Sequence, residues 1–185
     1  MGVVVSNGTS IVGRKNNDNI DYYQTPIVAT EALLSVVDFR GWILEPCCGA
    51  GAISRVLEKH NYTVKSSDIR NDDSVYGRKG VNMFNISKKV SNVVSNPPYC
   101  IAQEVIEHSL TLAKRKVAML LKLTFLESEK RKSFFEKFPF SKVLVFRKRI
   151  TMFPEGTDKP KNSGTITFAW FIWDTQDASQ KIGWL

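Results

Sequence analysis

The sequence predicts an α/β fold with a mostly parallel sheet and helices on both faces. Short apolar runs typical of buried strands alternate with segments of helical spacing, as in strand–helix–strand units. The last two apolar runs are joined by residues 147–164, which show no helical pattern. Strands joined without a crossover helix pair antiparallel, so we expect the final strand to run against the others.

The first half of the chain contains four expected strands and one helix. An apolar strand over residues 42–45 runs into a proline, and residues 51–59 then carry apolar side chains at helical spacing. Residues 63–68 form a second strand and residues 80–83 a weak third. A fourth strand over residues 90–95 ends at two consecutive prolines, which lack the N–H groups that a sheet ladder needs.

The second half of the chain continues this alternation. Residues 102–112 have the spacing of an amphipathic helix, and residues 117–123 form a fifth strand. Residues 126–137 are a charged helix that ends before a proline. The sixth and seventh strands are expected at residues 143–146 and 165–173.

Length and composition indicate one domain in a reducing compartment. The chain has 185 residues, 43% of them hydrophobic, which is enough to bury a single core. Residues 1–20 are rich in Gly, Asn, Ser and Asp and are expected to form a flexible arm. No apolar run reaches the ~18–20 residues of a membrane span. Three cysteines, two of them adjacent, favour a cytoplasmic protein without disulfides.

The net charge of +8 is unevenly distributed along the chain. Residues 114–149 hold 12 Lys or Arg against 3 Asp or Glu, which accounts for the whole excess. A polyanion, most simply nucleic acid, is the partner that such clustered charge predicts, because phosphate neutralisation dominates nucleic-acid affinity. The candidate phosphate contacts are Lys130, Arg131, Lys132, Arg147, Lys148 and Arg149.

A glycine-rich turn, Glu45-Pro46-Cys47-Cys48-Gly49-Ala50-Gly51, connects the first strand to the first helix. Glycine is needed where the backbone approaches a ligand closely or adopts a positive φ. The third glycine of the dinucleotide fingerprint is replaced by Ser54, whereas Asp68 ends the next strand, where an acid can bind a ribose diol. A nucleoside without a pyrophosphate fits this pattern, and S-adenosylmethionine fits better than NAD. For Asp68 the alternative is a turn former.

A second motif, Asn96-Pro97-Pro98-Tyr99, follows the fourth strand. Two prolines stiffen the backbone and leave carbonyl groups free to accept hydrogen bonds. An Asn carboxamide beside such carbonyls can bind both hydrogens of a planar amine, which favours a pyramidal, more nucleophilic nitrogen. Tyr99 offers a flat face to the ring that carries the amine. A rigid loop that merely ends a strand would explain neither the Asn nor the Tyr.

These motifs together resemble the S-adenosylmethionine-dependent amino-methyltransferases, particularly N6-adenine methyltransferases of phage and restriction type. The resemblance covers residues from about 21 to 174. Asp21-Tyr22-Tyr23-Gln24-Thr25-Pro26 is similar to the family's N-terminal cofactor motif, Asp-x-Tyr-x-Thr-Pro. Glu45 to Gly51 resembles its Glu/Asp-Pro-x-x-Gly-x-Gly loop, and Asn96 to Tyr99 its catalytic Asp/Asn-Pro-Pro-Tyr/Phe tetrapeptide.

The resemblance implies a Rossmann-like, seven-stranded methyltransferase fold, a single catalytic domain over residues 21–185, and S-adenosylmethionine as the cofactor. It also implies methyl transfer to the N6 amine of adenine in DNA by Asn96, Pro97, Pro98 and Tyr99, with no metal. Phe153, in the loop before the last strand, would hold the target base with Tyr99. The motifs and strand-end loops give these candidate cofactor-binding residues: Tyr23, Thr25, Pro26, Glu45, Pro46, Cys47, Cys48, Gly49, Gly51, Asp68, Ile69, Asn82, Met83, Phe84 and Asn96.

The sequence departs from the family pattern in two places. Asn82 stands where the family commonly has an acid that binds the adenine amine of the cofactor, although an amide oxygen can accept the same bond. We expect no separate target-recognition domain, and therefore methylation of adenines in short sequence contexts. Whether a homodimer supplies further contacts stays open.

Other substrates and one other class of protein remain as alternatives. Methyltransferases of an RNA base amine, adenine or guanine, and of a protein glutamine amide use similar Asn-Pro-Pro-Tyr loops. The basic segment favours nucleic acid over a protein amide but does not separate DNA from RNA. A nucleic-acid-binding module that keeps the fold without catalysis is the remaining alternative.

Overall fold

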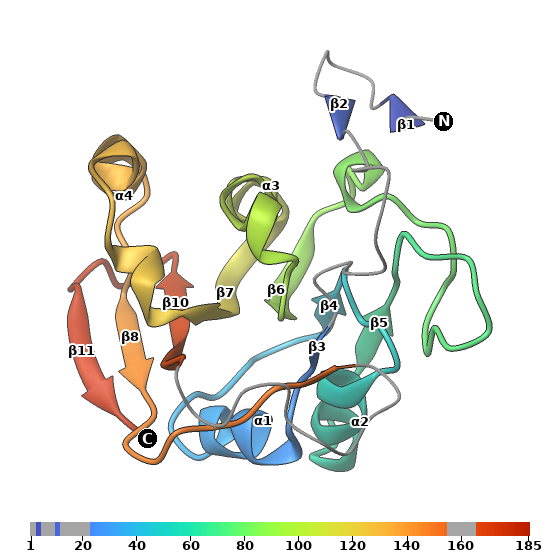
Figure 1. Ribbon diagram of the computed structural model, residues 1–185, viewed down its shortest axis with the longest axis horizontal. Helices are drawn as coiled ribbons and strands as arrows, with labels where there is room; N and C mark the ends of the chain where they lie inside the picture. Colours follow the sequence, from blue (N-terminus) through green and yellow to red (C-terminus); the bar gives the residue numbers. More distant parts are fainter. Residues whose placement is uncertain (1–2, 5–9, 12–22, 155–165) are drawn as a thin grey trace.

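A central seven-stranded sheet organises the computed structural model, which describes residues 3–4, 10–11, 23–154 and 166–185 (Figure 1). The strand order is β11-β8-β10-β7-β6-β4-β5. Strand β10 pairs antiparallel with both of its neighbours, and every other pair in this sheet is parallel. The strands are β4 (Ile43–Glu45), β5 (Val64–Ser66), β6 (Val90–Ser95), β7 (Ala113–Lys122), β8 (Lys142–Val145), β10 (Phe168–Asp174) and β11 (Lys181–Trp184).

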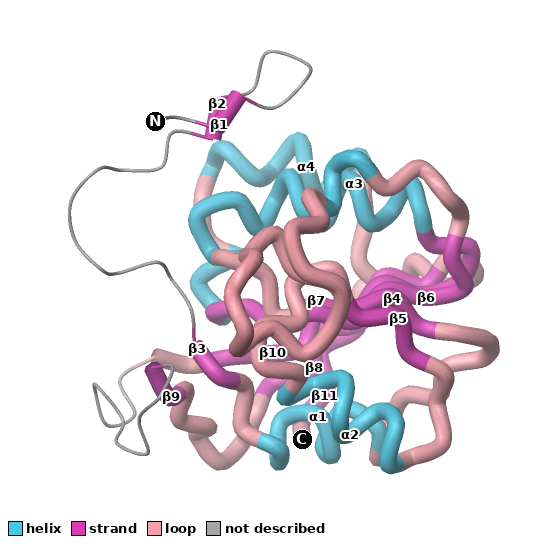
Figure 2. The backbone as a smooth tube through the Cα atoms, turned by 90° about the vertical axis from the view of Figure 1, so that its right-hand side faces the viewer, coloured by secondary structure: helices cyan, strands magenta, loops and turns pink. Residues whose placement is uncertain are grey.

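Helices cover both faces of this sheet, as the sequence predicts. Helices α1 (Ile27–Leu34) and α2 (Ala52–Lys59) lie on one face, and α3 (Ala102–Leu112) and α4 (Lys132–Lys137) on the other (Figures 1 and 2). In the described part of the chain, the connections contain the 3-10 turns η1 (Met83–Asn85), η2 (Tyr99–Ile101), η3 (Leu123–Leu126) and η4 (Glu129–Arg131). Two small antiparallel pairs join β1 (Val3–Val4) to β2 (Ser10–Ile11) and β3 (Tyr23–Gln24) to β9 (Phe153–Pro154).

The two central strands β7 and β10 are buried on both faces, which explains their nearly continuous apolar sequences. Phe171 and Trp173 pack into the core beneath α3 and α4, whereas Trp170 and Ile172 pack into the core beneath α1. The Trp170 indole also donates a hydrogen bond to the Ala29 carbonyl (2.8 Å), which ties α1 to the sheet. Buried side chains on alternate residues thus fix both layers of helices.

The predicted fold class is confirmed, with a mostly parallel sheet and an antiparallel strand near the end of the chain. The expected strand over residues 80–83 is wrong. Its backbone turns back to the end of β5, because Gly80 N–H donates to the Arg70 carbonyl and Val81 N–H to the Asp68 carbonyl. The sheet still has seven strands, because the unpredicted strand β11, whose exposed residues carry no clear strand pattern, pairs with β8. Since β11 is parallel to β8, the antiparallel strand β10 is the second last strand of the chain and not the final one.

The helical segments also differ from expectation in two places. The helix predicted over residues 126–137 is reduced to α4, because Ser128 adopts a φ of 126° that interrupts a continuous helix. Helix α1 is not anticipated at all. The expected arm over residues 1–20 lies outside the described residues apart from β1 and β2. In the described ranges, no helix has the length and apolar character needed to cross a bilayer.

Replacing Gly51 with Ala should destabilise the fold more than the same change at Gly80. Both glycines have a left-handed backbone, with φ of 81° and 66°, which costs other residues about 1–2 kcal/mol. A Cβ at Gly51 would also lie 2.3 Å from the Tyr76 ring, whereas one at Gly80 would lie 3.6 Å from its nearest neighbour. Urea unfolding of Gly51→Ala and Gly80→Ala compares the two costs. Equal losses would show that Tyr76 moves aside.

Candidate active site

One cavity lies at the carboxyl ends of β4 and β6, where the chain order of the sheet reverses. This is the place where open α/β sheets bind ligands. Thirteen of the residues proposed from the sequence line it: Tyr23, Thr25, Glu45, Pro46, Cys47, Cys48, Asp68, Ile69, Asn82, Met83, Phe84, Asn96 and Pro98. The proposed residues that do not line it are Pro26, Gly49, Gly51, Pro97, Tyr99 and the basic residues; Phe153 has no described side chain.

The glycine-rich turn is held by backbone bonds to the end of β5 and the loop that follows. Cys48 N–H donates to the Ser67 carbonyl (3.0 Å), and Tyr76 N–H donates to the Gly49 carbonyl (2.8 Å). Gly51 begins α2 with a left-handed backbone and lies against the Tyr76 ring. Gly51 is therefore required by the fold of the turn itself, because the group that leaves no room for a Cβ is the Tyr76 ring and not a ligand.

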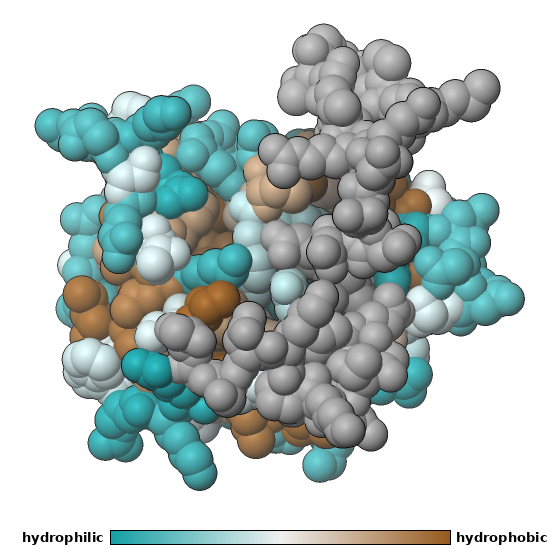
Figure 3. Space-filling model, viewed as in Figure 1, coloured by the Kyte–Doolittle hydropathy of each residue, from teal (hydrophilic) through white to brown (hydrophobic). Residues whose placement is uncertain are grey.

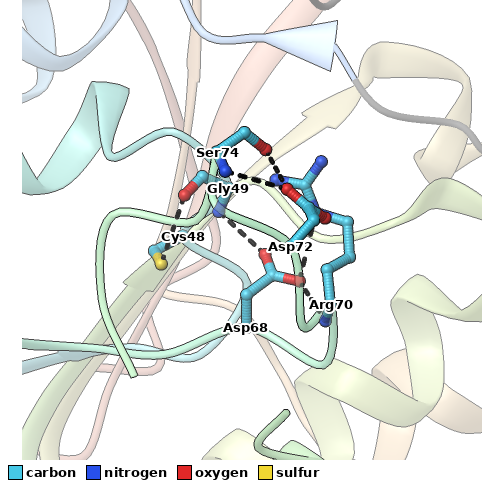
Figure 4. Close-up of polar contacts among 6 residues, drawn as sticks. All are labelled: Cys48, Gly49, Asp68, Arg70, Asp72 and Ser74. Atoms are coloured by element: carbon cyan, nitrogen blue, oxygen red, sulfur yellow. Dashed lines mark hydrogen bonds and ion pairs between the residues drawn. The ribbon is translucent and has the colours of Figure 1, made fainter. Parts of the chain in front are cut away.

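Asp68 is buried at the wall of the cavity and binds the glycine-rich turn (Figure 4). Its Oδ2 accepts the Gly49 N–H at 2.8 Å, and its Oδ1 accepts the Arg70 N–H at 3.0 Å. The Arg70 guanidinium forms an ion pair with the same Oδ1 at 3.5 Å. A carboxylate offers about four acceptor positions, so Asp68 keeps capacity for a pair of hydroxyl groups from a ligand.

Asn82 lines the cavity and also stabilises the 3-10 turn that follows it. Its Oδ1 accepts the Phe84 N–H (3.0 Å) and so caps η1. The amide oxygen that was expected to bind an adenine amine is therefore already hydrogen-bonded once, although it retains a second lone pair. Met83 and Phe84 in η1 add an apolar wall to this end of the cavity.

Glu45, at the end of β4, is almost fully buried, with 1% of its surface exposed. Burial raises the pKa of its carboxyl group to about 8, despite the hydrogen bond that it accepts from the Ser54 hydroxyl. Burial likewise raises the pKa of Cys47, and raises that of Cys48 to about 11. Both thiols stay protonated near neutral pH, which suits them to packing and not to nucleophilic attack.

The Asn96 side chain is oriented by two acceptors near the N-terminus of α1. Its Nδ2 donates to the Thr25 hydroxyl (3.1 Å) and to the Tyr23 carbonyl (3.4 Å). Because a carbonyl can only accept, the amide nitrogen must face Tyr23 and the amide oxygen must face away. This Oδ1 is buried, and no donor in the described part of the chain reaches it. Asn96 therefore presents a free acceptor at the wall of the cavity.

Tyr99 begins η2, three residues after Asn96. Its ring centroid is 6.1 Å from that of Phe168, and the Lys122 ammonium lies 4.6 Å from its centroid. The pairing of β3 with β9 brings the backbone of Phe153 opposite Gln24, next to the segment that holds Asn96. The side chain of Phe153 lies outside the described residues, so its expected role is not tested.

The basic clusters lie at two opposite edges of the sheet. Residues 147–149 follow the carboxyl end of β8, on the same edge as the cavity, and are exposed. Lys130 and Lys132 are exposed near the start of α4, over which hydrophilic side chains gather (Figure 3). Residues 114–116 instead occupy the opposite edge, at the start of β7. Arg131 differs from its neighbours, because its Nη1 donates to three backbone carbonyls, those of Thr124, Phe125 and Glu127.

Sequence reasoning missed seven cavity residues: Gln24, Ala52, Ile53, Arg70, Val81, Ile101 and Val105. Gln24 and Arg70 directly adjoin proposed residues, so their positions in the motifs could have identified them. Ile101 and Val105 belong to η2 and α3, whose apolar spacing indicates only core packing. The rotation of α3 over the sheet decides which of its apolar residues reach the cavity.

Solved structures of several methyltransferases share this fold. A candidate RNA methyltransferase from Pyrococcus horikoshii superposes with a TM-score of 0.61 at 18% identity, over 86% of this chain and 90% of that one. A SAM-dependent O-methyltransferase from Thermotoga maritima gives a TM-score of 0.55 at 14% identity, over 84% of this chain and 68% of that one.

A third similar structure is the modification subunit of a candidate type I restriction enzyme from Vibrio vulnificus. It gives a TM-score of 0.53 at 11% identity, and this chain spans 91% of its own length and 46% of that subunit. No protein-family model and no curated protein matches the sequence. These identities establish a shared fold, and the expected Rossmann-like methyltransferase fold is confirmed.

The folded protein should become less stable as pH rises, because Glu45 is buried, and replacing Glu45 with Gln should remove this loss of stability. Between pH 4.5 and about 8 the folded protein keeps a proton on Glu45 that the unfolded chain has released. Stability therefore falls as pH rises through that window, by about 1.4 kcal/mol for each pKa unit by which folding shifts the group. Glu45→Gln should remove this slope and stabilise the protein more at pH 8 than at pH 5.

Urea unfolding at several pH values measures this slope. Glu136→Gln changes an exposed glutamate on α4 and controls for the loss of one carboxyl group. Parallel pH curves for Glu45→Gln and the parent would contradict the prediction.

Proposed function

We propose that the protein transfers a methyl group from S-adenosylmethionine to the exocyclic N6 amine of adenine in DNA. The observation that carries this proposal is the Asn96 Oδ1, a buried acceptor whose orientation is fixed and which no described donor reaches. A buried polar atom without a partner is costly, so it is expected to meet one in the functional complex. The partner that fits an acceptor beside a proline carbonyl is an N–H group.

The cavity fits S-adenosylmethionine on three counts. Asp68 retains acceptor capacity for a ribose diol. Ile69, Met83 and Phe84 supply apolar surface for an adenine ring. Glu45, neutral when buried alone, would be favoured in its ionised form by the positive charge of the methionine moiety.

The reaction needs positioning more than chemical activation by the protein. S-adenosylmethionine, when bound, supplies a methyl group on a positively charged sulfur, which keeps the bonding electron pair as the methyl group leaves. Asn96 Oδ1 and the Pro97 carbonyl would accept the two amine hydrogens and direct the nitrogen lone pair toward the cofactor. Tyr99, with Phe153, would hold the extruded base. The methylated nitrogen then releases one proton to water, and most of the rate comes from alignment.

Nucleic acid is the substrate class favoured by charge. Residues 147–149 lie on the cavity edge of the sheet and are exposed, as are Lys130 and Lys132 near the start of α4. These exposed basic residues fit a nucleic-acid substrate in the cytoplasm, whereas methylation of a glutamine amide would not require a basic surface. RNA adenine or guanine is the second candidate, because the same amine geometry serves both. A second copy of this chain could extend the nucleic-acid surface.

Incubation with radiolabelled S-adenosylmethionine and separate pools of DNA, RNA and protein tests this proposal. We expect label in DNA, at N6-methyladenine after digestion to nucleosides. Label in RNA alone would favour the second candidate, and label in protein alone would favour a glutamine amide. Label in none of the pools would leave a binding module without catalysis.

Asn96→Ala should abolish methyl transfer while leaving cofactor binding nearly intact. The substitution removes the acceptor for the amine but none of the residues proposed to bind ribose or adenine. Asp68→Asn is the matched variant with the opposite expectation, because a hydrogen bond to a charged group contributes ~1.5–3 kcal/mol, about tenfold or more in affinity.

Calorimetry of cofactor binding, together with methylation at saturating cofactor, separates the two variants. We expect Asn96→Ala to lose turnover and keep affinity, and Asp68→Asn to lose affinity and recover turnover as cofactor is raised. Normal turnover in Asn96→Ala would refute the assigned role of the carboxamide.

A further inference from the structure

Lys122 is the last residue of β7 and lies at the cavity edge of the sheet. Its ammonium nitrogen is 4.6 Å from the centroid of the Tyr99 ring. Phe168 is the residue directly opposite Lys122 on β10, so both side chains lie on the same face of the sheet. Phe168 also contacts the Tyr99 ring, with centroids 6.1 Å apart. The lysine is thereby held against the aromatic residue of the Asn-Pro-Pro-Tyr motif.

The charge of Lys122 is not neutralised by the described protein. Within residues 23–154 and 166–185, Lys79 pairs with Asp73 and Lys116 with Asp174, but Lys122 forms no ion pair with a carboxylate. Its side chain is partly buried, so its position is more restricted than that of an exposed lysine. A partly buried cation without an anion, in contact with the aromatic residue of the Asn-Pro-Pro-Tyr motif, is available to an anionic group of a ligand.

We propose that Lys122 binds a phosphate of the target nucleotide, the one whose base lies against Tyr99. This inference rests on the proposed function and makes its substrate class more specific. A base and its own phosphates are linked through one sugar, so a base held at Tyr99 brings a phosphate to the immediate surroundings of that ring. Lysine binds phosphate as a point charge with three donors. Free nucleobases and protein amides carry no phosphate, so Lys122 selects for a target base that belongs to a nucleotide.

The test compares protein and substrate changes in one cycle. The protein variants are Lys122→Met, which keeps length and removes charge, and Lys122→Arg, which keeps charge. Lys65→Met is the matched control, because Lys65 lies 4.5 Å from the Trp42 ring centroid, on β5 at the far edge of the sheet. The substrate is a DNA oligonucleotide that the parent methylates at one mapped adenine, made with either ordinary linkages or a neutral methylphosphonate 5′ or 3′ of that adenine.

We expect the parent to lose about tenfold or more in kcat/KM when one of the two linkages is neutral, as for a lost charged hydrogen bond. Lys122→Met should show the same loss with ordinary DNA and no further loss with the neutral linkage. Lys122→Arg should restore most of the activity, and Lys65→Met should behave as the parent.

Oligonucleotide binding, measured by fluorescence anisotropy without cofactor, gives a readout that is independent of activity. The slope of log affinity against log salt should decrease by about one for Lys122→Met and stay unchanged for Lys65→Met. If Lys122→Met and the parent lose equally at the neutral linkage, the inference is overturned while the proposed function stands. If the parent methylates no polynucleotide, the proposed function and this inference both fail.

Discussion

The orientation of the Asn96 carboxamide is the constraint on which the candidate active site depends. Its two amide hydrogens face Tyr23 and Thr25, and only this arrangement leaves the oxygen available to a ligand. Thr25 is buried immediately before α1, and α1 is tied to the sheet through the bond from the Trp170 indole to Ala29. A fully buried tryptophan in the central strand β10 therefore helps to place an acceptor at the carboxyl end of β6.

The same edge of the sheet carries groups that a stable core would not favour. A buried carboxyl group at Glu45 and an unpartnered amide oxygen at Asn96 both cost folding free energy in the free protein. A bound cation would stabilise the ionised form of Glu45, and a bound N–H group would satisfy Asn96. Local departures from the rules of stability are expected where a site is shaped for a ligand. Their location on one cavity wall supports assigning them to one reaction.

The sequence predicts the strand ends that line the cavity well, and the segments between them less well. Strand β6 and its prolines, and strand β4 and its glycine-rich turn, follow from local signals that the fold keeps. The expected strand at residues 80–83 does not form, because its backbone N–H groups donate hydrogen bonds to the carbonyls of Asp68 and Arg70. These are tertiary contacts, which composition does not reveal. Strand β11 is missed because an edge strand pairs on one side only and needs no apolar pattern.

Charge in sequence also differs from charge in space. Strand β7 runs from Ala113 to Lys122, and at ~3.3 Å per residue it separates residues 114–116 from Lys122 by about 20–26 Å. The Debye length at physiological salt is ~8 Å, so charges at one end of β7 scarcely act at the other.

Some of the basic residues are also occupied by partners within the protein. Lys116 is paired with Asp174, and Arg131 binds the carbonyls of η3 and of Glu127. The basic excess of residues 114–149 thus overstates the positive charge near the cavity. The cations near the cavity are a smaller set: Lys122, which contacts the Tyr99 ring, and the exposed residues 147–149 along the same edge of the sheet. A few well-placed cations fit the positioning of one nucleotide better than a continuous basic surface, because phosphate contacts set register and orientation.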